Sequence, residues 1–276
     1  MSAAQTTAIV VSYKTGPRLR ECLFALAYDP AIRDVLVVDN GNGKAETAWL
    51  GAFAAKRDHV TILAPGSNIG FGAGVNFAAA SVDSGDLLII NPDAVLKRGS
   101  VEAMRTAGNG LKTPWIIGGK VFDVSGCEVR GPRRRKLTLW RALTSFAGWN
   151  TWTLEDTPAP DKSVPMDVVS GALMLISKAG FDQLGGFDET YFLHVEDVDL
   201  CRRAWEAGGE VIYCPEAGAL HYGSTSDVPS AEIARHKADS LIHYFRKFAS
   251  NPLERLAVRA VAPALKGAVS RKASGR

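Results

Sequence analysis

Four segments of the chain combine carboxylate, amide, hydroxyl and imidazole side chains in patterns that could bind a polar ligand or move a proton. They are Ser12-Tyr13, Asp39-Asn40, Asn91-Pro92-Asp93 and His194-Val195-Glu196-Asp197. An ionised carboxylate accepts hydrogen bonds or coordinates a divalent cation, and a well-placed one can take a proton from a hydroxyl group. The sequence therefore predicts a site built mainly on carboxylates.

The first three of these segments stand at the ends of short apolar runs that are typical of buried strands. These runs are Thr7–Tyr13, Val35–Val38 and Asp86–Ile90. A further strand is expected between them at Val60–Leu63, and helices are expected from Pro17 onward and at Lys44–Lys56 and Phe71–Ala80. The alternation predicts an α/β fold with a mostly parallel central sheet flanked by helices. Because ligands of such sheets bind beyond the carboxyl ends of the strands, the three segments should share one crevice.

The second half of the chain is organised differently. Strands are expected at Ile116–Val121, Ala172–Ile176 and Glu210–Tyr213, and helices at Val195–Ala207 and Ala231–Phe248. In the basic stretch that follows residue 250, Pro263 is expected to interrupt any helix.

Other nucleotide-binding and hydrolytic folds are excluded by their missing signatures. The Gly43-Lys44 pair is followed by Ala45, so it is not a Walker loop. The glycines of 70–74 have the wrong spacing for a dinucleotide fingerprint, and no G-x-S-x-G elbow occurs. The predicted sheet must therefore bind its ligand with acidic and amide side chains.

Several longer segments together resemble the family-2 inverting glycosyltransferases of GT-A fold, especially bacterial rhamnosyltransferases of surface-polysaccharide synthesis. The segments are IVVSYKTGPRLRECLFAL, VLVVDNGNG, SNIGFGAGVNFA, IINPDAVL, SGALMLISKAGFDQLGGFDETYFLHVEDVDLCRRAWEAGG and HYGSTS, in the family order across roughly residues 7–226. The resemblance implies one GT-A domain at 1–250, with a nucleotide-binding half at 1–110 and an acceptor-binding half at 111–250. Residues 251–276 would form a basic, membrane-associating tail.

The resemblance also implies a binding site for the nucleotide-sugar donor at the strand ends. Its residues would be Ser12, Tyr13, Asp39, Asn68, Gly70, Gly72, Asn76, Asn91 and Asp93. Gly70 and Gly72 would let the backbone approach the nucleotide where a Cβ would obstruct it. Asp39 could equally be a turn residue, and Asn76 could be an ordinary helix residue.

The resemblance further implies a divalent metal cofactor, Mn²⁺ or Mg²⁺, held by Asp93 and His221 against the donor diphosphate. Asn91 stands where the family's Asp-x-Asp pattern has its first carboxylate, which weakens the expected metal site. His221 could instead have a structural role.

Asp197 would be the general base that takes the acceptor hydroxyl's proton during a single inverting displacement. Glu196 and Tyr191 would contact the acceptor. Without the resemblance, Glu196 and Asp197 could be favourable charges at a helix N-terminus, and Tyr191 could be a core residue. Asp199 and Arg203 lie four residues apart on the same expected helix and should form an ion pair.

The expected partners are a nucleotide-sugar donor and a glycan or lipid-linked glycan acceptor, with no nucleic acid. Residues 130–141 hold six basic and no acidic side chains, and residues 251–276 hold six basic side chains and one Glu. The first stretch is followed by aromatic residues that include Trp140, Trp149 and Trp152, a combination suited to a membrane interface. A solvated loop is the alternative. We expect a cytoplasmic protein that contacts the inner face of the cytoplasmic membrane.

The function expected from this resemblance is transfer of L-rhamnose from dTDP-rhamnose to a hydroxyl of a growing, lipid-linked bacterial surface glycan. A UDP-hexose donor is the alternative, and a catalytically inactive glycan- or nucleotide-binding scaffold is another, favoured by Asn91. A nucleotidyltransferase would need a glycine-rich segment near the first strand, where only Gly16 occurs.

Overall fold

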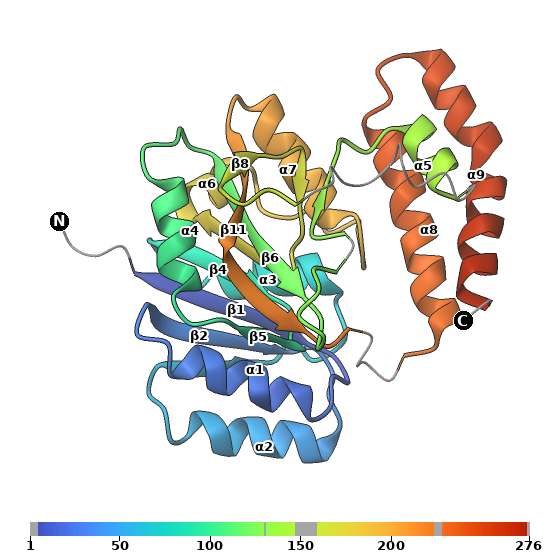
Figure 1. The fold of residues 1–276 in the computed structure, drawn as a ribbon. Helices are drawn as coiled ribbons and strands as arrows, with labels where there is room; N and C mark the ends of the chain where they lie inside the picture. Colours follow the sequence, from blue (N-terminus) through green and yellow to red (C-terminus); the bar gives the residue numbers. More distant parts are fainter. Residues whose placement is uncertain (1–4, 130, 147–158, 224–227, 275–276) are drawn as a thin grey trace.

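The computed structural model describes residues 5–129, 131–146, 159–223 and 228–274. Its centre is a nine-stranded sheet in the order β3-β2-β1-β4-β10-β6-β11-β5, with β8 paired to β11 (Figure 1). Trp149 and Trp152 lie outside the described residues, so the expected aromatic patch is described only in part.

The first half of the sheet is parallel, as predicted. Its strands are β1 (Thr6–Ser12), β2 (Ile32–Asp39), β3 (Val60–Leu63) and β4 (Asp86–Ile90). The connecting helices are α1 (Arg18–Ala27), α2 (Lys44–Ala54) and α3 (Phe71–Ala79). The carboxyl ends of β1, β2 and β4 therefore meet at one edge, which is where the crevice was expected.

The second half mixes strand directions. It contains β5 (Ala94–Leu96), β6 (Trp115–Phe122), β8 (Val164–Pro165), β10 (Leu173–Ser177) and β11 (Glu210–His221), with helices α4 (Ser100–Gly108), α6 (Lys178–Gln183) and α7 (Glu196–Glu206). Strand β10 lies antiparallel between β4 and β6, while β11 runs parallel to β6. Strands β7 (Arg133–Arg134) and β9 (Val168–Val169) form a separate two-stranded sheet.

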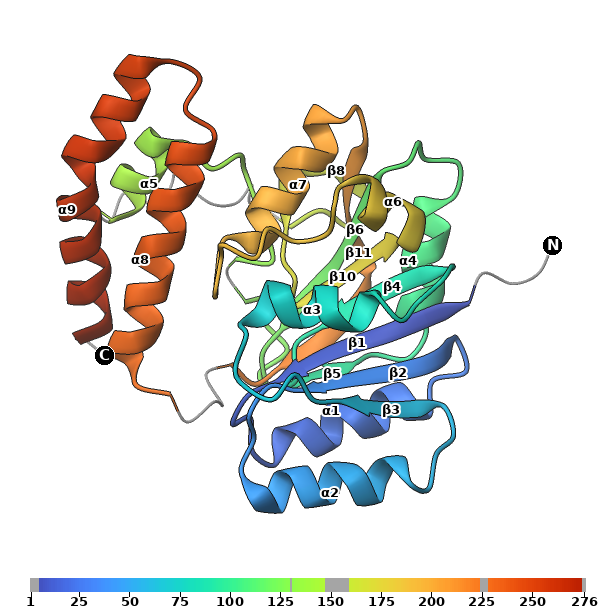
Figure 2. The same cartoon turned by 180° about the vertical axis from the view of Figure 1, so that it is seen from behind.

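Helices cover both faces of the central sheet, because its buried strands point alternate side chains to opposite sides. In β1, Ala8 and Val10 pack with α1, α2 and α4, whereas Ile9 and Val11 pack with α3 and α7. Figure 2 shows α3 lying across the face opposite to α1 and α2. Two hydrophobic layers thus enclose the sheet and fix the positions of its strand ends.

Helices α5 (Leu139–Phe146), α8 (Ser230–Lys247) and α9 (Pro252–Ser274) gather on one side of the molecule (Figures 1 and 2). The expectation that Pro263 interrupts a helix is wrong, since α9 continues through it. Val258, Leu265 and Val269 are at most 5% exposed and pack into the core beside α8, and this burial compensates for the lost hydrogen bond. None of the described helices is long and apolar enough to cross a membrane.

Candidate functional site

The predicted crevice begins where β1 and β2 end, because their parallel register sets Ser12 beside Asp39. Asp39 is buried, and the loop after β2 supplies its hydrogen-bond donors. Its Oδ1 accepts from the backbone N–H and the side-chain amide of Asn42, both at 2.9 Å, and its Oδ2 accepts from the Thr47 hydroxyl at 2.6 Å. Burial raises the pKa of Asp39, but these hydrogen bonds outweigh it and hold the pKa below the usual value. Asp39 is therefore an ionised, fixed group at the crevice.

Ser12 and Tyr13 lie against the same loop. The Ser12 hydroxyl donates to Oδ1 of Asn42 at 3.1 Å. The half-buried Tyr13 ring lies beside Gly41, and the Lys14 ammonium is 5.2 Å from the ring centroid. Ser12, Tyr13 and Asp39 thus form one wall, as predicted.

Asn40 connects this wall to the segment before α3, a role that sequence reasoning missed. Its Nδ2 donates to Oδ1 of Asn68 at 2.8 Å and to the Gly70 carbonyl at 3.1 Å, while its Oδ1 accepts from the Ile69 N–H at 3.0 Å. The Asn68 side chain is thereby held by Asn40. Asn68 also borders an open groove that is lined by Ile69, Ala73, Asn76, Phe77, Glu189 and Phe192.

Gly70 and Gly72 were expected to make room for a nucleotide, but in the structure they make room for other residues of the protein. Gly70 has φ of +90°, and a Cβ there would lie 2.5 Å from the Phe192 carbonyl oxygen. A Cβ on Gly72 would lie 3.0 Å from Cβ of Phe187. The close approach is therefore to the chain itself, which locks α3 against the segment before α7.

Asn76 also serves the packing of α3 in this structure. Its Nδ2 donates to the Phe187 carbonyl and to Oε1 of Glu189, both at 2.9 Å, and its Oδ1 accepts from the Phe187 N–H at 2.9 Å. Both amide hydrogens thus have protein partners, so the expectation that this amide is available to a donor is corrected.

Asp93 and His221 meet because β5 pairs with the end of β11 and sets His221 opposite Ala94. Nε2 of His221 lies 3.0 Å from Oδ1 of Asp93 and 3.2 Å from Nδ2 of Asn91. A carboxylate oxygen and an imidazole nitrogen so close together can bind one divalent cation. Within the described ranges, no group of three His, Cys, Asp or Glu side chains is placed to hold a metal. The pair fits an ion that takes its remaining ligands from water or a diphosphate.

Asp197 is connected to the end of β4, which precedes Asp93, through the backbone of Gly171 and Ala172. The Asn91 N–H donates to the Ala172 carbonyl at 3.2 Å, and the neighbouring Gly171 N–H donates to Oδ2 of Asp197 at 3.3 Å. The start of antiparallel β10 therefore brings the end of β4 and the first turn of α7 to one edge of the sheet. The predicted metal ligands and the predicted base share this edge.

Asp197 also forms an ion pair that sequence reasoning missed. Nη2 of Arg134 donates to Oδ2 of Asp197 at 2.9 Å. The basic run around Arg134 was expected to form one patch facing an anionic partner, and for Arg133 this is wrong. Arg133 is 2% exposed and holds both oxygens of Glu128, while Arg134 turns to the site.

The segment before α7 has unusual backbone and electrostatics. His194 and Val195 have φ of +68° and +73°, a strained conformation for a β-branched residue such as Val195. Burial lowers the pKa of His194 to about 4. Burial, reinforced by the negative charge of Asp197, raises the pKa of Glu196 to about 8, and its Oε2 is buried without a hydrogen-bond partner. Strain and an unsatisfied carboxyl group at one place are typical of a functional site.

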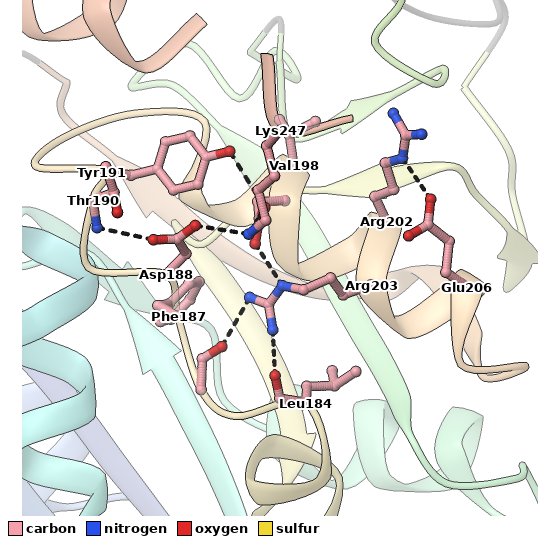
Figure 3. A network of polar contacts seen from close by, with 12 residues as sticks. Leu184, Phe187, Asp188, Thr190, Tyr191, Val198, Arg202, Arg203, Glu206 and Lys247 are labelled. Carbon is pink, nitrogen blue, oxygen red and sulfur yellow. Dashed lines mark hydrogen bonds and ion pairs between the residues drawn. The ribbon is translucent and has the colours of Figure 1, made fainter. Parts of the chain in front are cut away.

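Tyr191 was expected to contact the acceptor, and the structure corrects this. Its side chain is 1% exposed, and its hydroxyl donates to Oδ1 of Asp199 at 3.3 Å. Figure 3 shows Tyr191, Lys247 and Arg203 converging on this region from three directions. The predicted ion pair of Asp199 with Arg203 is confirmed, at 2.6 Å. This network stabilises the second half and presents no free sugar-binding ring at Tyr191.

Comparisons with known proteins agree with this architecture. Residues 4–240 match the model of the family described as "Glycosyltransferase like family 2". The chain is 29% identical to the N-acetylglucosaminyl-diphospho-decaprenol L-rhamnosyltransferase of Mycobacterium tuberculosis, covering 85% of this chain and 82% of that protein. It is also 29% identical to rhamnosyltransferase WbbL of Escherichia coli K12, covering 78% and 82%.

Solved structures share the fold at low sequence identity. The mannosyltransferase PcManGT from Pyrobaculum calidifontis, solved with GDP-Man and Mn²⁺, superposes with a TM-score of 0.63 at 16% identity, over 98% of this chain and 73% of that one. GalNAc-T7, solved with UDP, GalNAc and Mn²⁺, gives a TM-score of 0.62 at 11% identity over 84% of this chain. The chain spans about half, 47%, of the GalNAc-T7 structure.

A sheet of GT-A type with carboxylates at its strand ends defines a glycosyltransferase, and the matched family model covers most of the chain. The protein belongs to glycosyltransferase family 2. Within that family it is similar to rhamnosyltransferases.

Proposed function

We propose that the protein transfers L-rhamnose from dTDP-rhamnose to a hydroxyl group of a lipid-linked glycan, with inversion at the anomeric carbon. The observation that carries the mechanism is the link between the Asp93–His221 pair and Asp197, in which the Ala172 carbonyl bonds the Asn91 N–H and the Gly171 N–H bonds Asp197. This arrangement supports a leaving diphosphate on the Asp93 side and an attacking hydroxyl on the Asp197 side. The names of the two rhamnosyltransferase relatives support the choice of sugar and acceptor.

Each side chain has a distinct part in the proposed reaction. Asp39, with Ser12 and Tyr13, would bind the nucleoside of the donor. Asp93 and His221 would hold a divalent cation, which, when bound, would neutralise charge on the departing nucleoside diphosphate. Asp197 would accept the proton as the acceptor oxygen attacks the anomeric carbon and the bond to the diphosphate breaks. No covalent glycosyl-enzyme is required.

A donor panel tests the proposal. Thermal unfolding is measured with dTDP-rhamnose, UDP-glucose, UDP-galactose and GDP-mannose, each with and without Mn²⁺. A ligand present at a hundred times its dissociation constant stabilises a protein by about 2.7 kcal/mol, which is readily detected. We expect a shift with dTDP-rhamnose that requires Mn²⁺ and is lost in Asp93→Ala. A shift with a UDP-hexose alone would replace the donor, and no shift with any donor would favour a non-catalytic scaffold.

We also propose that the first turns of α9 contact an anionic membrane surface that carries the acceptor. Leu253 and Leu256 are 78% and 62% exposed, and Arg255 and Arg259 lie exposed beside them. Apolar side chains flanked by cations suit the interface of an anionic bilayer.

Point substitutions test this contact better than deletion of α9, because Leu265 and Val269 are part of the core. We expect Leu253→Ser/Leu256→Ser to abolish sedimentation with phosphatidylglycerol vesicles and to leave thermal stability unchanged. Val124→Ser, at another exposed apolar residue, is the matched control. Unchanged sedimentation of the double variant would exclude this surface.

A further inference from the structure

The contact between Arg134 and Asp197 is set by the short strand β7. Strand β7 pairs with β9, with Arg133 opposite Val169 and Arg134 opposite Val168. Successive side chains of a strand point to opposite sides. Arg133 points into the body, where its guanidinium holds Glu128 at 3.0 and 3.1 Å and lies 5.4 Å from the Tyr213 ring centroid. With Arg133 anchored, Arg134 is directed to the other side, toward α7.

Arg134 and the start of β10 fix one oxygen of Asp197 from outside its own helix. Oδ2 accepts from Nη2 of Arg134 at 2.9 Å and from the Gly171 N–H at 3.3 Å. A charge-assisted hydrogen bond of this length is directional, and Asp197 is only 8% exposed, so little water competes with it. The carboxylate is therefore held in one orientation before any substrate binds.

The adjacent carboxyl group receives no such contact. Glu196 is 6% exposed, and its Oε2 has no hydrogen-bond partner in the structure. Its pKa is raised by burial first and by the charge of Asp197 second. Two buried carboxyl groups thus stand side by side with one guanidinium hydrogen-bonded to one of them. The guanidinium therefore distinguishes the two neighbouring carboxyl groups by its hydrogen bond to Asp197.

We propose that Arg134 is a positioning residue that selects Asp197, rather than Glu196, as the base and orients it toward the acceptor hydroxyl. The proposal rests on the function proposed above, in which Asp197 takes the acceptor's proton. It assigns Arg134 no contact with the donor, so donor binding should not depend on it.

The first experiment separates catalytic rate from substrate binding. We expect Arg134→Gln to lower kcat by about 10²-fold, the cost of a misplaced reacting group, while KM for donor and acceptor stays unchanged. Arg135→Gln removes the same charge from the next, exposed residue and is the matched control, with kcat as in the wild type. A raised acceptor KM with unchanged kcat would instead make Arg134 an anion-binding residue and overturn the proposal.

Chemical rescue distinguishes orientation of the base from support of the fold. In Arg134→Ala, millimolar guanidinium chloride should restore part of kcat, because the free ion can occupy the vacated position beside Asp197. Arg134→Lys should lose less activity than Arg134→Gln, since it keeps the charge but not the planar donor pair. If guanidinium leaves the Ala variant unchanged and the Lys variant is as slow as the Gln variant, the proposal fails.

A double-variant cycle separates failure of this inference from failure of the proposed function. Once Asp197→Asn has removed the base, Arg134→Gln should cause no further loss. Full activity of Asp197→Asn would contradict the proposed function. An inactive Asp197→Asn together with a fully active Arg134→Gln would contradict this inference alone.

Discussion

Two buried aspartates of helix α7, Asp197 and Asp199, have sharply different surroundings. Two residues along a helix correspond to about 200° around its axis, so the two side chains face nearly opposite sides. Asp199 is 0% exposed, and its oxygens meet Arg203 and Lys247 at 2.6 Å each and the Tyr191 hydroxyl at 3.3 Å. Asp197 has one guanidinium and one backbone N–H from outside its helix.

Asp199 belongs to a network that stabilises the fold, whereas Asp197 is the reactive group in the proposed function. Around Asp199 every charge faces an opposite charge, and Lys247 also binds Asp188 at 2.7 Å, which ties α8 to the segment before α7. Around Asp197 the neighbouring Glu196 retains an unsatisfied buried oxygen. Buried polar groups are normally satisfied, so this oxygen is an exception that the proposed function would explain by a hydrogen bond from the substrate.

The largest expected effect is that of replacing Asp197, the proposed base. Asp197→Asn should lower kcat by about 10³-fold, or about 4 kcal/mol, because the amide cannot accept the hydroxyl's proton. Its melting temperature should stay near that of the wild type. The measurement is steady-state transfer to an acceptor glycan beside a thermal melt. An active Asp197→Asn would remove the distinction between the two carboxylates.

Asp199→Asn should give the opposite pattern. Loss of this charge leaves Arg203 and Lys247 facing a neutral group, at an expected cost of about 2 to 3 kcal/mol in the free energy of unfolding, since both cations are partly exposed to screening water. Urea denaturation gives the free energy, and kcat is measured on the folded fraction. The comparison is contradicted if the protein stays as stable and kcat falls instead.

Lys247→Met should have a smaller effect of the same kind, about 1 to 2 kcal/mol, because Arg203 still pairs with Asp199. The free energy of unfolding is again measured in urea, with Arg246→Met, an exposed neighbour, as the control. Equal stability of the two variants would show that the bridge from Asp188 to Asp199 contributes nothing.

The last expected effect concerns the pH dependence of stability. The pKa of Glu196 rises from an ordinary value of 4.5 to about 8 on folding, so the folded state binds more protons between these values. The contribution of Glu196 to stability is therefore full below pH 4.5 and is lost as the pH rises toward 8. Glu196→Gln does not titrate, so its melting temperature should improve relative to the wild type from pH 5 to pH 8.5. A constant difference across this range would show that Glu196 ionises normally.

Sequence reasoning located all four strands of the parallel half, and two of them to the residue. The expected strands Val60–Leu63 and Asp86–Ile90 have the observed bounds of β3 and β4. A strand buried on both faces is a continuous apolar run, and its ends are marked by the first polar residues. The same rule brought Ser12, Asp39 and Asn91 to one edge of the sheet.

Elements that depend on distant packing were misjudged. Strand β11 was expected to end at Tyr213, but a register shift between Cys214 and Gly218 lets the strand continue to His221. Helix α9 was expected to stop at Pro263, and its burial against α8 overrides the local signal. Local patterns do not contain these compensating contacts.

The same contrast between local sequence patterns and distant contacts applies to the candidate site. Asp93 and His221, predicted as partners, do meet, but through the pairing of β5 with β11, of which β5 was not predicted. Arg134 lies 63 residues before Asp197 and was interpreted as part of a surface patch. No strand was predicted at Arg133–Arg134, so the alternation that sends the two side chains to opposite sides became visible only in the structure.

The reversed direction of β10 has a consequence for how such enzymes diversify. Strand β6 ends, and β10 begins, at the same edge of the sheet, so the stretch between them leaves and re-enters the sheet at neighbouring positions, with β8 pairing to β11 on the way. An excursion anchored at two adjacent points can be lengthened, shortened or exchanged while the parallel strands keep their register. Changes of length in this stretch are therefore expected to leave the register of β1 with β2 and β4 unaltered.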